Sequence, residues 1–203
     1  MTIRYPNGRK YTPIKQDAQP IKKSTPKDLS FSNRGKSLED EIDEANSFYL
    51  TRQLAVIHKK PVPIQIVNVE YPSRSAAVIR EAYFKTPSTT DYNGVYKGRY
   101  IDFDAKDTKN KTSFPLKNIH PHQMTHMRAA VEHGGICFLL VRFSTLNRYF
   151  VLPFDVVDST WHDMENGSRK SIPLEIFEQQ AIEIKVGYIP QLDYLKAVAA
   201  LLP

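Results

Sequence analysis

A run of eight residues, ICFLLVRF from Ile136 to Phe143, constrains the fold more than any other part of this sequence. Seven of the eight residues are apolar, and the alternation of polar and apolar residues that marks a half-exposed strand is missing. The run is far shorter than the roughly 18 to 20 apolar residues needed to cross a bilayer. A short continuous run of this kind is typical of a strand covered on both faces. It therefore predicts a sheet against which helices pack.

The other elements are predicted from helical spacing and from strand alternation. Helices are expected at 37–52, from about 121 to Gly134-Gly135, at 154–164 and at 192–202. Strands are expected at 54–60, 63–71, over the stretch that begins at Tyr100, and at 148–153, whereas 167–180 is expected to start as a loop. Segment 75–85 fits a helix or a strand, and its β-branched and aromatic residues favour the strand. Two turn signals, Asn93-Gly94 and Lys97-Gly98, precede the stretch that begins at Tyr100. This order predicts an α/β fold, a mixed β-sheet flanked by α-helices.

Positive charge is concentrated at the N-terminal end of the chain. The net charge is +6, and residues 1–36 hold nine Lys and Arg against two Asp, so that the rest of the chain carries a net charge of −1. This leader is rich in Pro, Ser, Thr and Lys, a composition that cannot bury enough apolar surface to fold. We expect a disordered basic arm over 1–32 and a single domain over 33–203. A flexible cationic arm favours polyanions, with nucleic acid first and anionic membranes second, although it can also serve only for solubility.

Several classes of protein are not supported by the sequence. The single cysteine, Cys137, excludes an intramolecular disulfide framework and fits a reducing cytosol. The chain has no apolar stretch long enough to span a membrane and no signal-peptide core at its start, so we expect a soluble cytoplasmic protein. It also lacks a glycine-rich phosphate loop, a Ser/His/Asp order and a dinucleotide fingerprint.

The stretch YIDFDAKDTKNKT, which starts at Tyr100, alternates with a period of two. The alternation places Ile101, Phe103 and Ala105 on one face of a strand and Tyr100, Asp102, Asp104 and Lys106 on the other. An apolar face toward a core is ordinary, whereas two carboxylates and a lysine on the opposite face are not. This face is either a solvated surface with an Asp/Lys pair or part of a site.

A metal site is the functional interpretation of this pattern. Asp91 precedes Asp104 by thirteen residues, and two carboxylates brought together by a hairpin form a site of hard oxygen ligands suited to Mg²⁺ or Mn²⁺. Lys106 is expected to point the same way, where its ammonium can orient a water or stabilise charge on a phosphoryl oxygen. In the hydrolysis of a phosphodiester, the metal lowers the pKa of the attacking water. Asp91, Asp104 and Lys106 are therefore the candidate catalytic residues.

Basic and aromatic residues surround this stretch. Segments 63–71 and 75–85 together resemble a long hairpin that projects from the domain. The candidate DNA-binding residues on the hairpin and beside the carboxylates are Lys59, Lys60, Arg74, Arg80, Tyr83, Phe84, Lys109 and Lys111. Lysines so close to a metal site favour contacts with phosphates, and the aromatic rings can stack on opened bases or simply pack the base of the hairpin.

Two weaker candidates lie on the predicted helices. His122 and His126 stand four residues apart, a spacing that can bind zinc, but Gln123 occupies the position where a zinc protease has its general-base Glu. Near the start of the first helix, Glu39 or Glu41 could supply an accessory carboxylate, although acidic residues there usually interact only with the helix dipole.

Four quoted segments carry a resemblance to a known family. They are NRG (33–35), AVIHKKPVPIQIVNVEYPSRSAAVI (55–79), EAYFKTPSTTDYNGVYKGRYIDFDAKDTKNKTSFPLKNIHPHQ (81–123) and YIPQLDYLKAV (188–198). They closely resemble RecU, the bacterial Holliday junction resolvase family. The resemblance implies a fold of the restriction-endonuclease type, a homodimer, and Mg²⁺- or Mn²⁺-dependent resolution of four-way DNA junctions by paired nicks in recombination and repair. A recombinase and branch-migration proteins are the further partners it implies.

The resemblance also implies roles for individual residues. Thr89, Asp91, Asp104 and Gln123 match the metal-site positions, and Lys106 matches the transition-state stabiliser. Residues 59–85 match a stalk that enters the junction centre. Where Asp104 stands, the family usually has Glu, which is one methylene longer, a difference of roughly 1.5 Å in reach. Two alternative functions therefore stay open: a junction-binding or remodelling protein with weakened or no nuclease activity, and an endonuclease that does not select for DNA structure.

Overall fold

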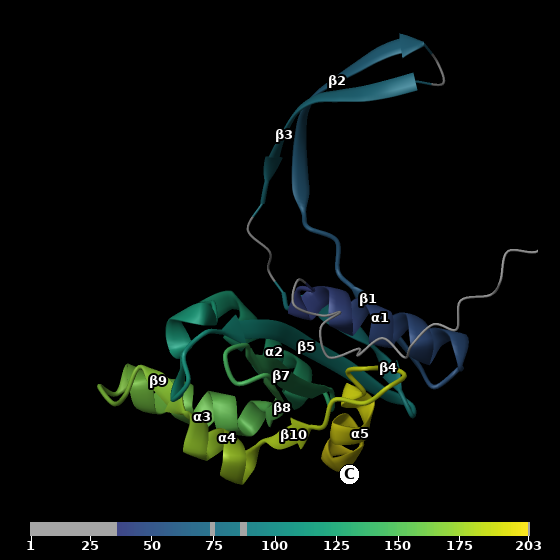
Figure 1. The fold of residues 1–203 in the computed structure, drawn as a ribbon. Coiled ribbons are helices and arrows are strands. Elements are labelled where there is room, and N and C mark those ends of the chain that lie inside the picture. Colours follow the sequence, from purple (N-terminus) through teal and green to yellow (C-terminus); the bar gives the residue numbers. More distant parts are fainter. Residues whose placement is uncertain (1–35, 74–75, 86–88, 203) are drawn as a thin grey trace, which may run out of the picture. The chain divides into compact units, whose positions relative to one another are not determined.

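A computed structural model describes residues 36–73, 76–85 and 89–202 of the 203-residue chain (Figure 1). The predicted basic arm (1–32) and the NRG segment lie outside the described residues, as does Arg74. No helix in the described ranges is long and apolar enough to cross a membrane.

The described residues form five α-helices, two short 3-10 helices and ten strands, most of which Figure 1 labels. The helices are α1 (Leu38–Thr51), α2 (Pro121–Glu132), α3 (Phe154–Glu165), α4 (Leu174–Gln180) and α5 (Tyr194–Val198), with short 3-10 helices η2 (Leu116–Asn118) and η3 (Ala199–Leu201). The strands are β1 (Ala55–Lys59), β2 (Ile64–Ser73), β3 (Ala76–Phe84), β4 (Tyr92–Tyr96), β5 (Arg99–Thr108), β6 (Ser113–Pro115), β7 (Ile136–Phe143), β8 (Arg148–Pro153), β9 (Ser171–Pro173) and β10 (Ile182–Ile184).

The central sheet has six strands in the order β1-β4-β5-β7-β8-β10. The pairing of β5 with β7 is parallel, and every other pairing in this sheet is antiparallel, so the sheet is mixed as predicted. Parallel neighbours need a crossover connection, and here it contains α2. The crossover brings the N-terminus of α2 against the middle of β5.

Both faces of the sheet are covered, as the run at β7 predicted. Phe138 and Leu140 pack in a core with α1 and α5, whereas Cys137, Leu139 and Val141 pack in a second core with α2, α3 and α4. Successive side chains of a strand point to opposite faces, so β7 contributes to both cores. The absence of polar residues in ICFLL follows from this double burial.

The two glycine turn signals have different outcomes. Lys97-Gly98 is the two-residue loop between β4 and β5, and both residues have positive φ, 47° and 75°, as a tight hairpin requires. The prediction of a turn at Asn93-Gly94 is wrong, because both residues lie within β4. A Cβ on Gly94 would stand 2.0 Å from the carbonyl oxygen of Val56, so glycine is needed there for the close approach of β1.

The helix starts and ends also follow local chemistry. Ser37 caps α1, and its side chain accepts a hydrogen bond from the Asp40 backbone while Asp40 accepts one from the Ser37 backbone.

The C-terminal helix is shorter than predicted, since α5 ends at Val198 and a 3-10 helix follows. Three strands of three residues each, β6, β9 and β10, and the helix α4 were not predicted, because such short segments carry no periodicity.

Strands β2 and β3 form a separate two-stranded antiparallel sheet, with Ile64 opposite Phe84 and Ser73 opposite Ala76. Almost every described side chain in it is exposed, including the large apolar ones. The pairing agrees with the predicted hairpin, and its projection as a stalk from the domain stays a prediction.

Candidate active site

The carboxylate of Asp104 lies at the centre of the predicted site. Asp104 is on β5, and its side chain has no exposed surface. On the opposite face of the strand, Phe103 is stacked between Tyr92 and Phe138, with ring centroids 4.9 and 4.7 Å apart. The interpretation as a solvated surface is therefore wrong for Asp102 and Asp104, which are buried where the α2 crossover packs against β5, whereas Tyr100 on the same face is exposed.

Each oxygen of Asp104 has a different environment. Oδ1 accepts hydrogen bonds from the backbone N–H of Asp91 at 3.1 Å and from Nε2 of Gln123 at 2.9 Å. Oδ2 forms an ion pair with Nζ of Lys106. Apart from that ion pair, Oδ2 has no hydrogen-bond partner among the described residues. One buried oxygen thus stays available to an electrophilic partner.

Burial is the main cause that raises the pKa of Asp104, to about 7. The charge of Lys106 lowers this pKa, whereas the nearby charge of Asp91 raises it. Without a further cation, the site therefore holds more negative charge than its surroundings neutralise. A divalent cation supplies that neutralisation, so the donor set fits a metal such as Mg²⁺ or Mn²⁺.

Asp91 reaches Asp104 through the backbone. It immediately precedes β4, its side chain is half-buried, and its N–H is the donor to Asp104 described above. Thr89 is also half-buried, and its hydroxyl donates a long hydrogen bond of 3.4 Å to the carbonyl of Thr90. The segment 89–91 thus brings the two predicted carboxylates together, and Thr89 lies two residues from Asp91.

Gln123 lies in the first turn of α2 and is buried. Its side-chain oxygen accepts a hydrogen bond of 3.0 Å from the backbone of His120, which leaves the amide nitrogen directed at Asp104. In this arrangement Gln123 orients a carboxylate, as partners of metal ligands commonly do. The family resemblance placed Gln123 among the metal-site residues but did not distinguish this role from direct ligation.

The described residues contain no group of three or more His, Cys, Asp or Glu side chains that could hold a metal ion. Any ion at Asp91 and Asp104 would complete its shell with hydroxyl, amide or backbone oxygens and with water, which suits Mg²⁺.

The zinc hypothesis for His122 and His126 finds no support, because Nε2 of His126 lies 3.0 Å from Asp102. Nε2 of His122 is buried, with no hydrogen-bond partner in the described part of the chain.

Asp102 is the residue for which the sequence offered no role. It is fully buried, and its carboxylate contacts Thr90, Tyr100, Lys60 and His126. Burial raises its pKa, but the hydrogen bonds from these four residues outweigh burial and leave the pKa lowered. Its place on the same strand face as Asp104, two residues away, was the signal that could have indicated a shared site.

The accessory carboxylate predicted on α1 is partly exposed. Oε2 of Glu39 lies 2.6 Å from Nζ of Lys59. The hydrogen bond with Glu39 is the main cause of the raised pKa of Lys59, and the charges of Glu39, Asp43 and Asp91 raise it further. The ammonium of Lys59 therefore interacts with carboxylates of α1 and with the carboxylate of Asp91.

The other candidate DNA-binding residues fall into two groups. Lys60 is largely buried and pairs with Asp102. The exposed members are Arg80, Tyr83, Phe84, Lys109 and Lys111. Arg80 pairs with Glu70, and the hydroxyl of Tyr83 lies 2.5 Å from Glu81. Phe84 is 83% exposed. The exposed members remain available to a ligand, whereas the Lys60 side chain is 18% exposed and its ammonium is paired with Asp102.

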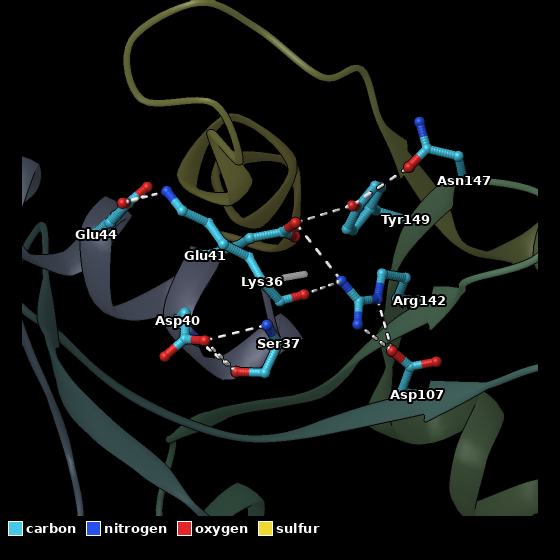
Figure 2. Close-up of polar contacts among 9 residues, drawn as sticks. All are labelled: Lys36, Ser37, Asp40, Glu41, Glu44, Asp107, Arg142, Asn147 and Tyr149. Carbon is cyan, nitrogen blue, oxygen red and sulfur yellow. Dashed lines mark hydrogen bonds and ion pairs between the residues drawn. The ribbon is translucent and has the colours of Figure 1, made fainter. Parts of the chain in front are cut away.

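A second charged cluster holds the start of α1 to the sheet (Figure 2). Nε of Arg142 on β7 donates to Asp107 at 2.6 Å, and its Nη1 lies 3.5 Å from Oε1 of Glu41. Glu41 is buried and also accepts a hydrogen bond of 3.3 Å from Tyr149. Burial raises the pKa of Glu41, and the charge of Arg142 opposes that effect. Figure 2 shows these residues converging from α1, β5, β7 and β8.

Comparison with known proteins gives a consistent result. Residues 33–200 match the family model described as Recombination protein U (RecU). A Holliday junction resolvase RecU of Bacillus cereus (strain B4264) is 52% identical over 199 residues, covering 98% of this chain and 97% of the relative. The proteins of the same name from Bacillus mycoides (strain KBAB4) and Bacillus thuringiensis (strain Al Hakam) are 51% identical with the same coverage.

Proposed function

Because this chain belongs to the RecU family, we propose that it is a metal-dependent endonuclease that resolves Holliday junctions by paired, symmetric nicks. The observation that carries this proposal is the environment of Asp104. A fully buried carboxylate beside Asp91 and Lys106, with one oxygen that only a cation partners, is suited to metal-assisted phosphodiester hydrolysis. The relatives are named as resolvases of Holliday junctions, which supports the four-way junction as the substrate.

We assign the metal to Asp91 and Asp104, with Thr89 nearby and Gln123 holding Asp104 in place. Mg²⁺ or Mn²⁺ bound there would neutralise the scissile phosphate and lower the pKa of the attacking water. Lys106 is only 14% exposed and lies beside Asp104, so its ammonium can face a phosphate oxygen of the substrate. Hydrolysis forms a bond from the water oxygen to phosphorus and breaks the bond from phosphorus to the leaving oxygen. The attacking water loses a proton, and the leaving oxygen gains one.

The exposed residues of β2 and β3 are proposed to contact the junction. Tyr71, Tyr83 and Phe84 expose 72%, 59% and 83% of their surface, far more than aromatic residues of a core. Exposed rings of this kind can stack on exposed base faces, and stacking is interrupted at a junction centre but not along a continuous duplex. Lys109 and Lys111, close behind Lys106 in the sequence, are assigned to the phosphate backbone.

A homodimer is proposed for a geometric reason. A four-way junction with two-fold symmetry needs two cuts, and a C₂ dimer presents two equivalent sites. The recombinase and branch-migration proteins that handle the same DNA in the cytoplasm are proposed as its functional partners.

The experiment that tests the proposal is cleavage of a labelled four-way junction in Mg²⁺ and in Mn²⁺. Wild-type protein is expected to produce symmetric nicks. Asp91→Ala is expected to abolish them while junction binding survives, and Asp163→Ala, which changes an exposed aspartate on α3, is the matched control. Binding without any product in either metal would support a junction-binding protein without nuclease activity.

A second arm tests selectivity for structure. Unlabelled linear duplex of the same sequence competes with the labelled junction for the enzyme. Efficient competition, together with cutting of the duplex, would favour an endonuclease that does not select for structure.

A further inference from the structure

The two ends of the hairpin segment meet beside the candidate active site. The chain leaves β1 at Lys59, forms β2 and β3, and returns at Thr89 before β4. The backbone N–H of Lys85 donates to the carbonyl of Pro63 at 2.9 Å, which closes the base of the hairpin. The backbone N–H of Lys60 donates to the carbonyl of Asp91 at 2.7 Å. The outgoing chain is thus hydrogen-bonded through its backbone to Asp91, a predicted metal ligand.

A single carboxylate contacts both of these ends. Asp102 Oδ2 accepts a hydrogen bond of 3.0 Å from Nζ of Lys60 on the outgoing chain. Its Oδ1 accepts one from the hydroxyl of Thr90 on the returning chain. Nζ of Lys60 also lies 2.9 Å from that hydroxyl, so the three side chains form a closed ring of contacts.

Two further groups hold the carboxylate without contacting the hairpin ends. The hydroxyl of Tyr100 donates to Oδ2 at 2.6 Å from within β5, and Nε2 of His126 lies 3.0 Å away on α2. The fully buried carboxylate is thus anchored to the sheet and to the crossover helix. It presents a rigid point to which Lys60 and Thr90 attach.

This arrangement connects the hairpin ends to the metal ligands by a short path. Thr90 is next to Asp91 in the chain, and Asp102 is two residues from Asp104 on the same face of β5. Asp91 is therefore held against Asp104 from both sides, by Thr90 through the chain and by Lys60 through its backbone hydrogen bond. A shift of either hairpin end must be accommodated at Asp91.

We propose that Asp102 is a positioning residue that clamps both ends of the hairpin segment, so that the placement of Asp91 relative to Asp104 depends on the position of the hairpin. Contacts of DNA with the hairpin would then change the geometry of the metal site. The inference rests on the proposed nuclease function for its catalytic consequence, whereas the clamp itself is a property of the free protein. A carboxylate with a purely structural role would stabilise the fold without linking the position of the hairpin to the geometry of the metal site.

A matched pair of variants separates the clamp from general stabilisation. Thr90→Val and Tyr100→Phe each remove one hydroxyl donor to Asp102, but only Thr90 lies on a hairpin end. In single-turnover cleavage at saturating junction, Thr90→Val is expected to slow nicking at least about tenfold, within the range seen for partners of metal ligands. Tyr100→Phe leaves His126 to anchor Asp102 and leaves both hairpin ends attached to it, so its slowing of nicking is expected to be several-fold smaller than that of Thr90→Val. Junction affinity is expected to change little in both variants.

A second readout does not depend on cleavage. Hydrogen exchange of the Lys60 amide reports its hydrogen bond to Asp91, and it is expected to accelerate about tenfold in Thr90→Val but not in Tyr100→Phe. Equal effects of the two variants on nicking and on this amide would overturn the proposal. If wild-type protein does not cut junctions, the proposed function fails, and the exchange of the Lys60 amide alone then decides for or against the clamp.

Discussion

The side-chain amide of Gln123 donates a hydrogen bond of 2.9 Å to Oδ1 of Asp104, from the first turn of α2 to the middle of β5. The contact depends on the crossover between two parallel strands, since it joins residues nineteen positions apart. It fixes one oxygen of Asp104 and leaves the other directed toward Lys106.

Gln123→Ala is expected to reduce cleavage by about 10- to 100-fold, the usual loss when a partner of a metal ligand is removed. The lost hydrogen bond also leaves Oδ1 of Asp104 with the Asp91 donor alone, at a cost of about 1 kcal/mol in stability. Cleavage rates and chemical denaturation measure the two effects. Gln179→Ala, an exposed glutamine on α4, serves as the control. Equal rates for both variants would contradict the role assigned to Gln123.

Asp104→Glu tests how the site tolerates a longer carboxylate. The extra methylene displaces the carboxylate by roughly 1.5 Å in a position with no exposed surface. We expect the variant to cut junctions at a rate within about 100-fold of wild type, the loss that a displacement of about 1 Å can cause, and with a different ratio of Mg²⁺ to Mn²⁺ rates. Asp104→Ala is expected to be inactive in both metals. An inactive Asp104→Glu would show that the site is built only for the shorter side chain.

The raised pKa of Asp104 predicts how metal-free stability depends on pH. The folded protein holds this proton up to a pKa of about 7, whereas the unfolded chain releases it near 3.8. The native state therefore binds more protons between these values, and the contribution of Asp104, full below pH 3.8, is lost as pH rises through 7. Denaturation of wild type and Asp104→Asn in metal-free buffer from pH 5 to 8 isolates this contribution. The free energy of unfolding of wild type relative to the variant is expected to fall over that range.

Metal binding is expected to reverse this trend. Because the ligand must lose its proton to bind a cation, Mg²⁺ should raise the melting temperature more at pH 8 than at pH 6. In Asp104→Asn the added Mg²⁺ should have little effect at either pH. A melting temperature that responds to Mg²⁺ equally in wild type and variant would place the ion elsewhere.

Removal of Arg142 is expected to destabilise the fold through Glu41. Arg142→Met leaves the buried Glu41 carboxylate without its cation, and breaking a buried pair in this way costs about 3–5 kcal/mol. The cost should be smaller at low pH, because burial already raises the pKa of Glu41 and protonation relieves the charge. The double variant with Glu41→Met is expected to recover most of the loss. Urea denaturation of wild type, both single variants and the double variant at pH 5 and pH 8 measures these free energies of unfolding. A double variant whose loss equals the sum of the two single losses would contradict the coupling.

Much of the architecture could be predicted from pattern. The run at β7 predicted a strand covered on both faces, and the alternation from Tyr100 placed Ile101 and Phe103 in the core. Strands β6, β9 and β10 were missed because three residues are too few to show a period. The glycine at position 94 was misinterpreted because the same residue serves a turn and a close approach of backbones, and only the contact with Val56 distinguishes them.

The sequence by itself determined which side chains share a face of β5, because a strand has a period of two whatever surrounds it. The alternation placed Asp102, Asp104 and Lys106 together, the spacing of the carboxylates added Asp91, and the family resemblance added Gln123. Only the tertiary structure decided that the two carboxylates on this face are buried, since their burial depends on the crossover that lays α2 over β5. Burial in turn raises the pKa of Asp104 and makes Asp102 the contact point of both hairpin ends. Those properties arise from residues distant in the chain, which no local period encodes.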